Sequence, residues 1–287
     1  MSLEVLRPGP LALVQDAGRP GLAAIGVSPS GAFDRAAFAA GALLVGNDPG
    51  HDAGIEVTLG GLVVRCDRQL LVALTGAPCP ATVDGRPAPA GEAFRLAAGQ
   101  VLALGLPGAG LRTYLSVAGG LAVPAVLGSR STDLLSGLGP ARLAVGDELP
   151  VGPVAGEPGA LPPGRWSGTA GTQAAVLELL PGPRLDWLAD AEALVTGWTV
   201  HPDSNRVGVR LDGPRLARAG DRAGVELPSE PLVRGAVQLP PSGHPVVFGP
   251  DHPTTGGYPV VAVLTEDSSD RLAQLRPGER FRFAWAG

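Results

Sequence analysis

Two neighbouring stretches, "LGGLVVRC" at residues 59–66 and "QLLVALTG" at residues 69–76, indicate the fold class. Each is a short apolar run that begins or ends near glycine, and only Asp67 and Arg68 separate them. Apolar runs of about four to eight residues, bounded by Gly, Pro or Asp, are typical of β-strands. Similar runs recur along the whole chain, at residues 11–16, 100–106, 111–121, 173–180 and 259–267. The sequence therefore predicts a mainly β protein of many short strands.

The glycine and proline content supports the same fold class. The 287 residues include 43 Gly and 30 Pro, which punctuate the apolar runs rather than forming tracts. We expect few helices. The best candidate is "SGAFDRAAFAAGALLVGND" at residues 30–48, with Ser30 as the N-cap and Gly46-Asn47 as the stop. A second, short helix is expected at residues 184–195, "RLDWLADAEALV".

The chain is expected to fold as two domains. The stretch at residues 150–172 is rich in Pro and Gly and has almost no periodicity, which favours a linker or a surface crossing. Both halves open with Pro-Gly-Pro, and both close with a turn that leads into a strand. We therefore predict β domains at residues 1–150 and 173–287, joined by residues 151–172.

Charge and composition exclude several functions. The formal net charge is −5 and no basic block stands out, which argues against a nucleic-acid partner. All 22 basic residues are arginine, so Schiff-base chemistry, a lysine-bearing phosphate loop and covalently attached biotin are excluded. Any anion or nucleotide has to be held by arginine and backbone amides.

The cysteines, histidines and apolar runs bear on location and metals. Cys66 and Cys79 fit no metal or redox spacing, and an inert thiol is expected at each. The four histidines show no paired spacing, so no metal site is expected. With no apolar stretch long enough to span a membrane and no secretion signal, we expect a cytoplasmic protein that binds no membrane.

Three polar segments are candidates for a site. In residues 15–34, Asp16 and Arg19 could orient a polar ligand beside Ser30 and Gly31, or could simply close a loop. In residues 127–139, Arg130 lies among hydroxyls that suit a carboxylate or phosphate, although Ser131 or Thr132 could equally cap residues 133–138. The third segment, residues 201–214, places Arg206 in a loop that enters a strand.

The stretch "DHPTTGGYP" at residues 251–259 poses the same choice between a turn and a ligand surface. Pro253 and Pro259 fix φ on either side of Gly256-Gly257, which we expect to use positive φ. Such a stiff turn would leave the Thr254, Thr255 and Tyr258 hydroxyl groups available.

These segments carry a resemblance to a known family. "QDAGRPGLAAIGVSPSGAFD", "LGSRSTD", "SNRVGVRLDGP", "VQLPPSGHPVV" and "TTGGYPVVAV" occur in that family's order along nearly the whole chain. The sequence resembles the biotin-dependent carboxyltransferase, or allophanate hydrolase subunit 2, family, which includes the C subunit of bacterial ATP-dependent 5-oxoprolinase. The resemblance implies two cyclophilin-like β-barrel domains with a few short helices.

The resemblance also implies a set of site residues, carried over by matching position. The implied catalytic residues are Arg19, Asp34, Arg130 and Arg206. The implied substrate- or nucleotide-binding residues are Asp16, Ser30, Gly31, Ser131, Thr132, Ser204, Gln238, Thr254, Thr255, Gly256, Gly257 and Tyr258. The sequence departs from the family pattern at Ala42, Asn205 and Pro253.

The implied function is ATP-dependent opening of 5-oxo-L-proline to L-glutamate. ATP, with Mg²⁺, is expected to bind in a complex with subunits B and A, because a lysine-free chain without a phosphate loop is not expected to run the reaction alone. Two alternatives stay open: a carboxyltransferase component of a biotin-dependent urea or amide carboxylase, and a regulatory binding protein that antagonises a histidine-kinase inhibitor.

Overall fold

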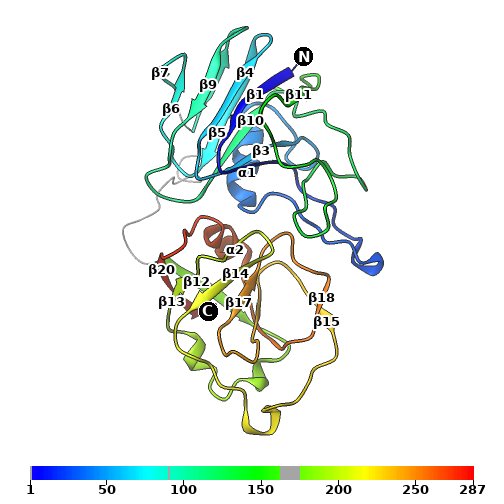
Figure 1. Cartoon of the computed structure of the whole chain (residues 1–287), viewed down its shortest axis with the longest axis vertical. Helices are drawn as coiled ribbons and strands as arrows, with labels where there is room; N and C mark the ends of the chain where they lie inside the picture. Colours follow the sequence, from blue (N-terminus) through cyan, green and yellow to red (C-terminus); the bar gives the residue numbers. More distant parts are fainter. Residues whose placement is uncertain (1, 90, 162–174) are drawn as a thin grey trace. The chain divides into compact units, whose positions relative to one another are not determined.

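The computed structural model describes residues 2–89, 91–161 and 175–287, which form two compact units (Figure 1). Unit 1 comprises Met1–Arg19, Ser30–Asp133 and Gly137–Ala170. Unit 2 comprises Pro20–Pro29, Leu134–Ser136 and Gly171–Gly287. Unit 2 thus takes in two short segments from the first half of the sequence. The second half of the predicted crossing at 151–172, from residue 162 onward, lies outside the described residues.

Unit 1 is built from two β-sheets and a helix. Within its described residues, a six-stranded sheet has the order β11-β1-β4-β9-β6-β7, and a five-stranded sheet has the order β2-β3-β10-β5-β8. Among the described residues, the strand pairs of these two sheets are antiparallel. The bounds are β1 Ser2–Pro8, β2 Leu11–Gln15, β3 Gly54–Thr58, β4 Leu62–Cys66, β5 Leu70–Gly76, β6 Ala81–Val83, β7 Arg86–Pro87, β8 Ala93–Leu96, β9 Val101–Leu104, β10 Arg112–Val117 and β11 Glu148–Pro150.

The core of unit 1 is shared by its two sheets. Val5 and Val64 from the six-stranded sheet belong to the same buried cluster as Ile55, Val72 and Leu115 from the five-stranded sheet. All five side chains are fully buried. The alternation of buried and exposed residues along β4 follows from this packing, because successive side chains of a strand point to opposite faces.

Helix α1, Arg35–Leu44, packs against β5 and β10 (Figure 1). It begins later than we predicted, because Asp34 is its N-cap: the Asp34 carboxylate accepts a hydrogen bond from Ala37 N at 2.9 Å. The prediction of Ser30 as the cap was therefore wrong. The helix ends as expected, with Gly46 at φ +76°. At Gly41, an added Cβ would lie 2.7 Å from Ser116 Oγ, so this glycine lets the helix approach the sheet closely.

Unit 2 is a closed barrel in the order β12-β19-β16-β17-β14-β13-β20, with a separate pair formed by β15 and β18. β20 runs parallel to β12, and the other pairs are antiparallel. The bounds are β12 Ala175–Pro181, β13 Gly197–Val200, β14 Gly208–Asp212, β15 Glu230–Pro231, β16 Ala236–Gln238, β17 Val246–Phe248, β18 Thr255–Gly256, β19 Val260–Leu264 and β20 Arg280–Trp285.

Aromatic side chains fill the barrel. Phe283 lies 5.1 Å from Phe281 and 6.5 Å from Trp198, measured between ring centroids, and all three are buried. Helix α2, Glu266–Leu272, was not predicted. It begins at Thr265, whose side chain accepts from Ser268 N, and it carries acidic residues in its first turn and Arg271 in its last.

The helix predicted at residues 184–195 was wrong. This segment contains two short 3₁₀ turns, Leu185–Trp187 and Glu192–Leu194, because tertiary contacts override its helical pattern. Trp187 is buried, with the guanidinium groups of Arg218 and Arg222 within 6 Å of its ring. Leu188 forms a β-bridge with Arg218.

The mainly β fold class with few helices is confirmed. In the described ranges, α1 and α2 are the two α-helices. No helix among these residues is both long and apolar enough to span a membrane. The strands of unit 1 lie in two sheets, whereas those of unit 2, apart from the β15–β18 pair, close into a barrel.

Candidate functional site

Asp16 organises the polar loops of unit 1. Its carboxylate, which is nearly buried, accepts hydrogen bonds from Gly18 N at 2.7 Å, Arg130 N at 2.6 Å, Ser129 Oγ at 2.6 Å and Ser131 Oγ at 2.5 Å. Both carboxylate oxygens are thus used within the protein. Asp16 therefore holds the two sequence-distant segments, 15–19 and 129–132, in contact with each other.

Arg19 is a buried cation without an acidic partner. Its side chain is 2% exposed, and its Nη2 donates to Ser131 O while its Nε lies 3.4 Å from Val126 O. Across the described residues, Arg19 Nη1 has no hydrogen-bond partner and the guanidinium has no ion pair. Burying an unpaired charge is costly unless a partner supplies the opposite charge. This arrangement is therefore suited to an anion.

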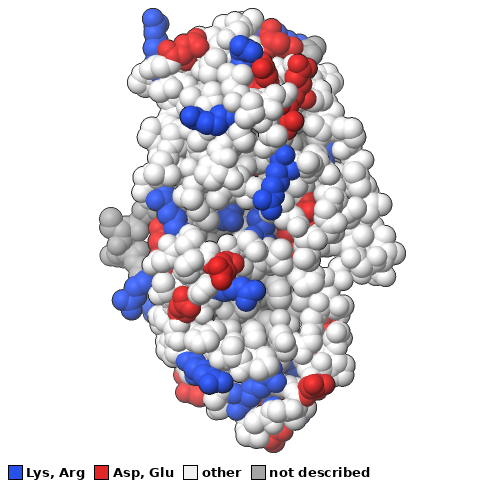
Figure 2. Space-filling view, viewed as in Figure 1, with Lys and Arg blue, Asp and Glu red and all other residues white. Residues whose placement is uncertain are grey.

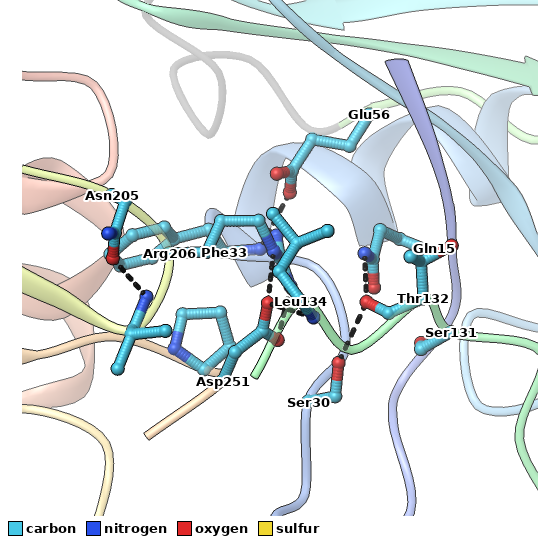
Figure 3. A network of polar contacts seen from close by, with 12 residues as sticks. Gln15, Ser30, Phe33, Glu56, Ser131, Thr132, Leu134, Asn205, Arg206 and Asp251 are labelled. Atoms are coloured by element: carbon cyan, nitrogen blue, oxygen red, sulfur yellow. Dashed lines mark hydrogen bonds and ion pairs between the residues drawn. The ribbon is translucent and has the colours of Figure 1, made fainter. Parts of the chain in front are cut away.

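Two more unpaired polar atoms belong to Thr132, which follows the Arg19-bonded Ser131, and to Gln15, which bonds to Thr132. Gln15 Nε2 and Ser30 Oγ both donate to Thr132 O, at 2.9 Å and 3.1 Å, and Figure 3 shows both side chains directed at this carbonyl. Gln15 Oε1 and Thr132 Oγ1 are buried and have no partner among the residues that the structure describes. We call Gln15, Arg19 and Thr132 the Arg19 cluster. It offers a charged donor, an amide acceptor and a hydroxyl.

Backbone geometry explains how these loops meet. Ser30 has φ +52° and Gly31 has φ +93°, and a Cβ at residue 31 would lie 3.0 Å from the Ala17 carbonyl. A side chain at residue 31 would therefore push the 30–31 segment away from the loop that carries Arg19. Gly139 serves the same purpose on the other side, because a Cβ there would lie 2.1 Å from Ser131 O.

Arg130 and the segment after it differ from our expectation. The Arg130 guanidinium donates to two backbone carbonyls, Val123 O at 2.9 Å and His51 O at 3.4 Å. Residues 133–138 form turns rather than a helix, so the capping role considered for Ser131 and Thr132 was wrong. Their side chains instead belong to the Asp16 loops and to the Arg19 cluster.

A second buried network of unit 1 surrounds Tyr114, which is fully buried. Tyr114 Oη donates to Glu56 Oε2 at 2.9 Å and accepts from Asp34 N at 2.8 Å. Arg112 Nε lies 3.4 Å from Glu56 Oε1. Burial, followed by the Glu56 and Asp34 carboxylates, raises the pKa of Tyr114 well above its usual value. Asp34, an implied catalytic residue, thus serves here as a helix cap beside a hydroxyl that stays protonated.

The raised pKa of Tyr114 predicts a loss of stability at high pH. Tyrosine in the unfolded chain ionises at about pH 10, while Tyr114 in the folded chain keeps its proton at that pH. Above that pH the unfolded state binds fewer protons, so the free energy of unfolding falls by up to about 1.4 kcal/mol per pH unit. Urea unfolding of Tyr114→Phe between about pH 9 and 11 is expected to show a shallower fall.

The chain offers a clean background and a control for that measurement. It contains no lysine to titrate in this range. Burial also raises the pKa of the Cys66 and Cys79 thiols, which contribute a fall in the same direction from about pH 8.5. Tyr258→Phe, at a 44% exposed residue, is the matched control. A Tyr114→Phe profile identical to that of the parent chain would contradict the prediction.

Unit 2 contains a buried ion pair between Arg206 and Asp251. Arg206 Nε donates to Asp251 Oδ2 at 2.8 Å and Nη2 donates to Oδ1 at 3.0 Å, and both side chains are at most 1% exposed. Leu134 N also donates to Asp251 Oδ2, at 3.2 Å (Figure 3). Arg206 lies in the loop that leads into β14, as predicted. Its bidentate pairing, however, holds the loop before β14 against the loop after β17.

The turn at residues 251–259 contains the short strand β18 and is partly exposed. Thr255–Gly256 forms β18, which pairs with β15, and Gln238 Nε2 donates to Tyr258 O at 2.9 Å. Neither Gly256 nor Gly257 has positive φ, so that prediction was wrong. A Cβ at residue 256 would lie 2.7 Å from Gln238 Nε2, so a side chain there would displace the amide that donates to Tyr258 O. Thr255 and Tyr258 are exposed.

Ser204 and Asn205 organise the loop before β14. Ser204 Oγ accepts from Arg210 N at 3.1 Å. Asn205 Oδ1 accepts from Val207 N at 2.8 Å and Gly208 N at 3.2 Å (Figure 3). An aspartate oxygen can accept the same bonds, so the departure at Asn205 preserves the turn. Of the other departures, Ala42 is buried in α1, and the Pro253 carbonyl accepts from His252 Nδ1 at 2.7 Å.

The structure therefore sorts the predicted residues by unit. In unit 1 it brings together Asp16, Arg19, Ser30, Gly31, Ser131 and Thr132, with the Arg130 backbone beside them and Asp34 in the Tyr114 network. In unit 2 it joins Gln238 with Gly256 and Tyr258, and places Thr254, Thr255 and Gly257 in the same turn. Arg206 pairs with Asp251, while Ser204 bonds to Arg210.

The comparisons with known proteins identify the family. A family model described as "Carboxyltransferase domain, subdomain A and B" matches residues 25–285, which is most of the chain. The chain belongs to this carboxyltransferase family. The family resemblance stated from the sequence motifs is thereby confirmed.

Members of the carboxyltransferase family that resemble this chain include two curated proteins. The chain is 39% identical to the 5-oxoprolinase C subunit of Escherichia coli K12 over 290 residues, which covers 98% of this chain and 90% of that protein. It is 32% identical to the 5-oxoprolinase C subunit of Haemophilus influenzae, with the same coverage of both chains.

A solved structure of a family member shares the fold. The crystal structure of the K. lactis urea amidolyase superposes with a TM-score of 0.91 at 30% identity. The match covers all of this chain and 19% of that much longer one. The matched part of the amidolyase and this chain thus share one fold.

Three residues of these networks were missed in the sequence analysis: Gln15, Glu56 and Asp251. Gln15 and Glu56 are polar residues in otherwise apolar strands, "LALVQ" and "GIEVT", and a polar residue in such a run is a signal that the sequence offers. Both side chains prove to be buried, where polar groups need hydrogen-bond partners. Asp251 was quoted as part of the turn, but nothing in its local sequence indicates a pairing with Arg206.

Proposed function

We propose that this chain is the C subunit of a 5-oxoprolinase, an enzyme complex that opens 5-oxo-L-proline to L-glutamate at the expense of ATP. Subunits A and B are the proposed partners, and ATP with Mg²⁺ is proposed to bind in the complex. The cytoplasm is the proposed location, where ATP is available and where the free, buried thiols of Cys66 and Cys79 would stay reduced. The full-length similarity to two proteins that bear the name of the 5-oxoprolinase C subunit supports the proposal.

The observation that carries the proposal is the unpaired charge of Arg19 in the Arg19 cluster. The substrate 5-oxoproline carries a carboxylate, and its ring holds an amide N–H next to a carbonyl. Arg19 Nη1 would donate to the carboxylate, Gln15 Oε1 would accept the ring N–H, and Thr132 Oγ1 would donate to the ring carbonyl. Each of the three atoms that lacks a protein partner would then have a substrate partner.

The reaction needs activation because a lactam is a resonance-stabilised amide. Transfer of the γ-phosphoryl group of ATP to the lactam oxygen releases ADP and makes the ring carbon electrophilic. Water then adds to that carbon, and the C–N bond breaks as the nitrogen takes up a proton. A second water cleaves the resulting acyl phosphate to the free carboxylate and phosphate. The Arg19 cluster would hold the lactam during these steps by binding and orienting it.

Reconstitution tests the proposal. Glutamate release from 5-oxo-L-proline and ATP would be measured with this chain added to, and omitted from, its co-expressed A and B subunits. We expect glutamate only when all three are present. A stable complex that releases no glutamate would contradict the proposal, and so would full activity without this chain.

A second candidate is favoured by the structural likeness to the K. lactis urea amidolyase. In that case this chain would pass a carboxyl group from biotin to urea or a similar amide. Because the chain has no lysine, biotin would arrive on another protein. Carboxylation of urea that depends on an added biotin carrier, in an assembly inactive on 5-oxo-L-proline, would establish this function instead.

A further inference from the structure

A cavity of about 400 Å³ lies on unit 2, and none of its lining residues belongs to the Arg19 cluster. It lies beside β14, the loop at residues 201–203 and the loop at residues 240–245. Pro240, Pro245 and Val246 give it an apolar wall, and its polar lining includes Arg210 and Asp212. In Figure 2, acidic and basic side chains lie side by side over the region that β14 occupies in Figure 1.

Arg210 and Asp212 lie on the same face of β14. Both are exposed, whereas Val209, which precedes Arg210, and Leu211, which lies between the two, are buried. Neighbours on one face of a strand are about 7 Å apart along the backbone. Throughout the described ranges, no hydrogen bond or ion pair is found for the Arg210 guanidinium or the Asp212 carboxylate. The cavity therefore presents a free cation and a free anion side by side.

The mixture of charges selects the class of ligand. A polyanion such as a nucleotide would bring its charge against the carboxylates of Asp203 and Asp212, which also line the cavity. A metal ion is not favoured either, because no group of three or more ligating side chains comes together within the described part of the chain. A ligand with one positive and one negative group can satisfy Arg210 and Asp212 at once.

We propose that this cavity binds a small zwitterionic α-amino acid. Arg210 holds the carboxylate through its planar fork of donors, and Asp212 holds the ammonium group. The two charges of an α-amino acid are joined through a single carbon, so the molecule bridges a gap of this width with one contact at each end. The apolar wall of Pro240, Pro245 and Val246 packs against its side chain.

His201 adds a further donor to the cavity. Its Nδ1 accepts a hydrogen bond from Asp203 N at 3.1 Å. The proton of the neutral ring is therefore on Nε2, which is available to a ligand carboxylate. The positive end of the cavity thus combines a guanidinium with an imidazole N–H.

A matched pair of ligands tests the proposal on the full chain alone. L-proline and 5-oxo-L-proline share a five-membered ring and a carboxylate, but only L-proline carries a charged nitrogen. Calorimetry in a buffer free of amino acids is expected to show saturable binding of L-proline with a Kd of about 1 mM or tighter. In an Arg19→Met chain, which lacks the proposed lactam site, 5-oxo-L-proline is expected to bind at least about tenfold more weakly than L-proline, because it leaves Asp212 unpaired.

Two variants locate the binding and a third controls for charge. Arg210→Gln and Asp212→Asn are each expected to weaken L-proline binding at least about tenfold. Both side chains are exposed, so the fold is expected to survive. Arg86→Gln, at an exposed strand arginine of unit 1, is expected to change nothing. No saturable L-proline binding below about 10 mM would overturn the proposal, as would unchanged affinity in both cavity variants.

This test is separate from the test of the proposed function. Amino-acid binding is measured on the isolated chain without ATP or partner proteins. Glutamate release is measured on the complex and depends on the Arg19 cluster in the other unit. Either result can therefore fail without the other.

Discussion

Arg19→Met is expected to abolish glutamate release by the reconstituted complex without unfolding the chain. The substitution removes the only charge in the Arg19 cluster, and losing a buried charge-assisted contact to a substrate carboxylate costs about 3–5 kcal/mol. We expect kcat/KM for 5-oxo-L-proline to fall at least about hundredfold. The melting temperature is expected to change little, because removing an unpaired buried charge offsets the loss of its two hydrogen bonds to backbone carbonyls.

The combination of the two readouts separates binding from structural support. A merely structural arginine would lower stability and activity together, whereas Arg19→Met is expected to lower activity alone. Arg65→Met controls for the loss of one positive charge at a half-exposed residue. Arg19→Lys keeps the charge but lacks the planar fork, so an intermediate loss is expected. Retained activity in Arg19→Met would show that the site is elsewhere.

Asp251→Ala is expected to destabilise unit 2 by about 3–5 kcal/mol. The substitution removes the carboxylate that pairs with Arg206 and accepts from Leu134 N, in a region with almost no solvent exposure. Three of the four tryptophans, Trp187, Trp198 and Trp285, lie in unit 2, so urea unfolding followed by tryptophan fluorescence reports mainly on that unit.

An exposed ion pair supplies the comparison for Asp251. Glu4 pairs with Arg65 in unit 1, with side chains 35% and 48% exposed, and Glu4→Ala is expected to cost less than about 1 kcal/mol. Asp251→Asn keeps an oxygen for Leu134 N but removes the charge, so its cost is expected to lie between the two. A loss below about 1 kcal/mol in Asp251→Ala would contradict the buried-pair interpretation.

Strands were easier to predict from the sequence than helix ends. The runs at residues 59–66 and 69–76 become β4 and β5, because short apolar runs bounded by glycine have few other ways to bury themselves. The start of α1 could not be fixed, since Ser30 and Asp34 are both capping residue types. Only the bond from Ala37 N to Asp34 decides between them.

The candidate site was predicted as a set of residues but not as an arrangement. Asp16, Arg19, Ser131 and Thr132 were singled out by residue type and family motif, and the structure brings them together. The sequence could not show that Asp16 is saturated by loop donors while Arg19 is left with a free Nη1. Those facts depend on contacts between segments more than 100 residues apart, such as Gln15 with Thr132.

The order of strands in the barrel of unit 2 has a consequence for its folding. β20, the last strand of the unit along the chain, lies between β12 and β13, its first two. During synthesis, β12 and β13 therefore emerge with a gap between them that only a strand about eighty residues further on can fill. Until then both keep a row of unpaired amides and carbonyls, the kind of edge on which chains associate wrongly. Unit 2 therefore needs protection of these two strand edges while it is made.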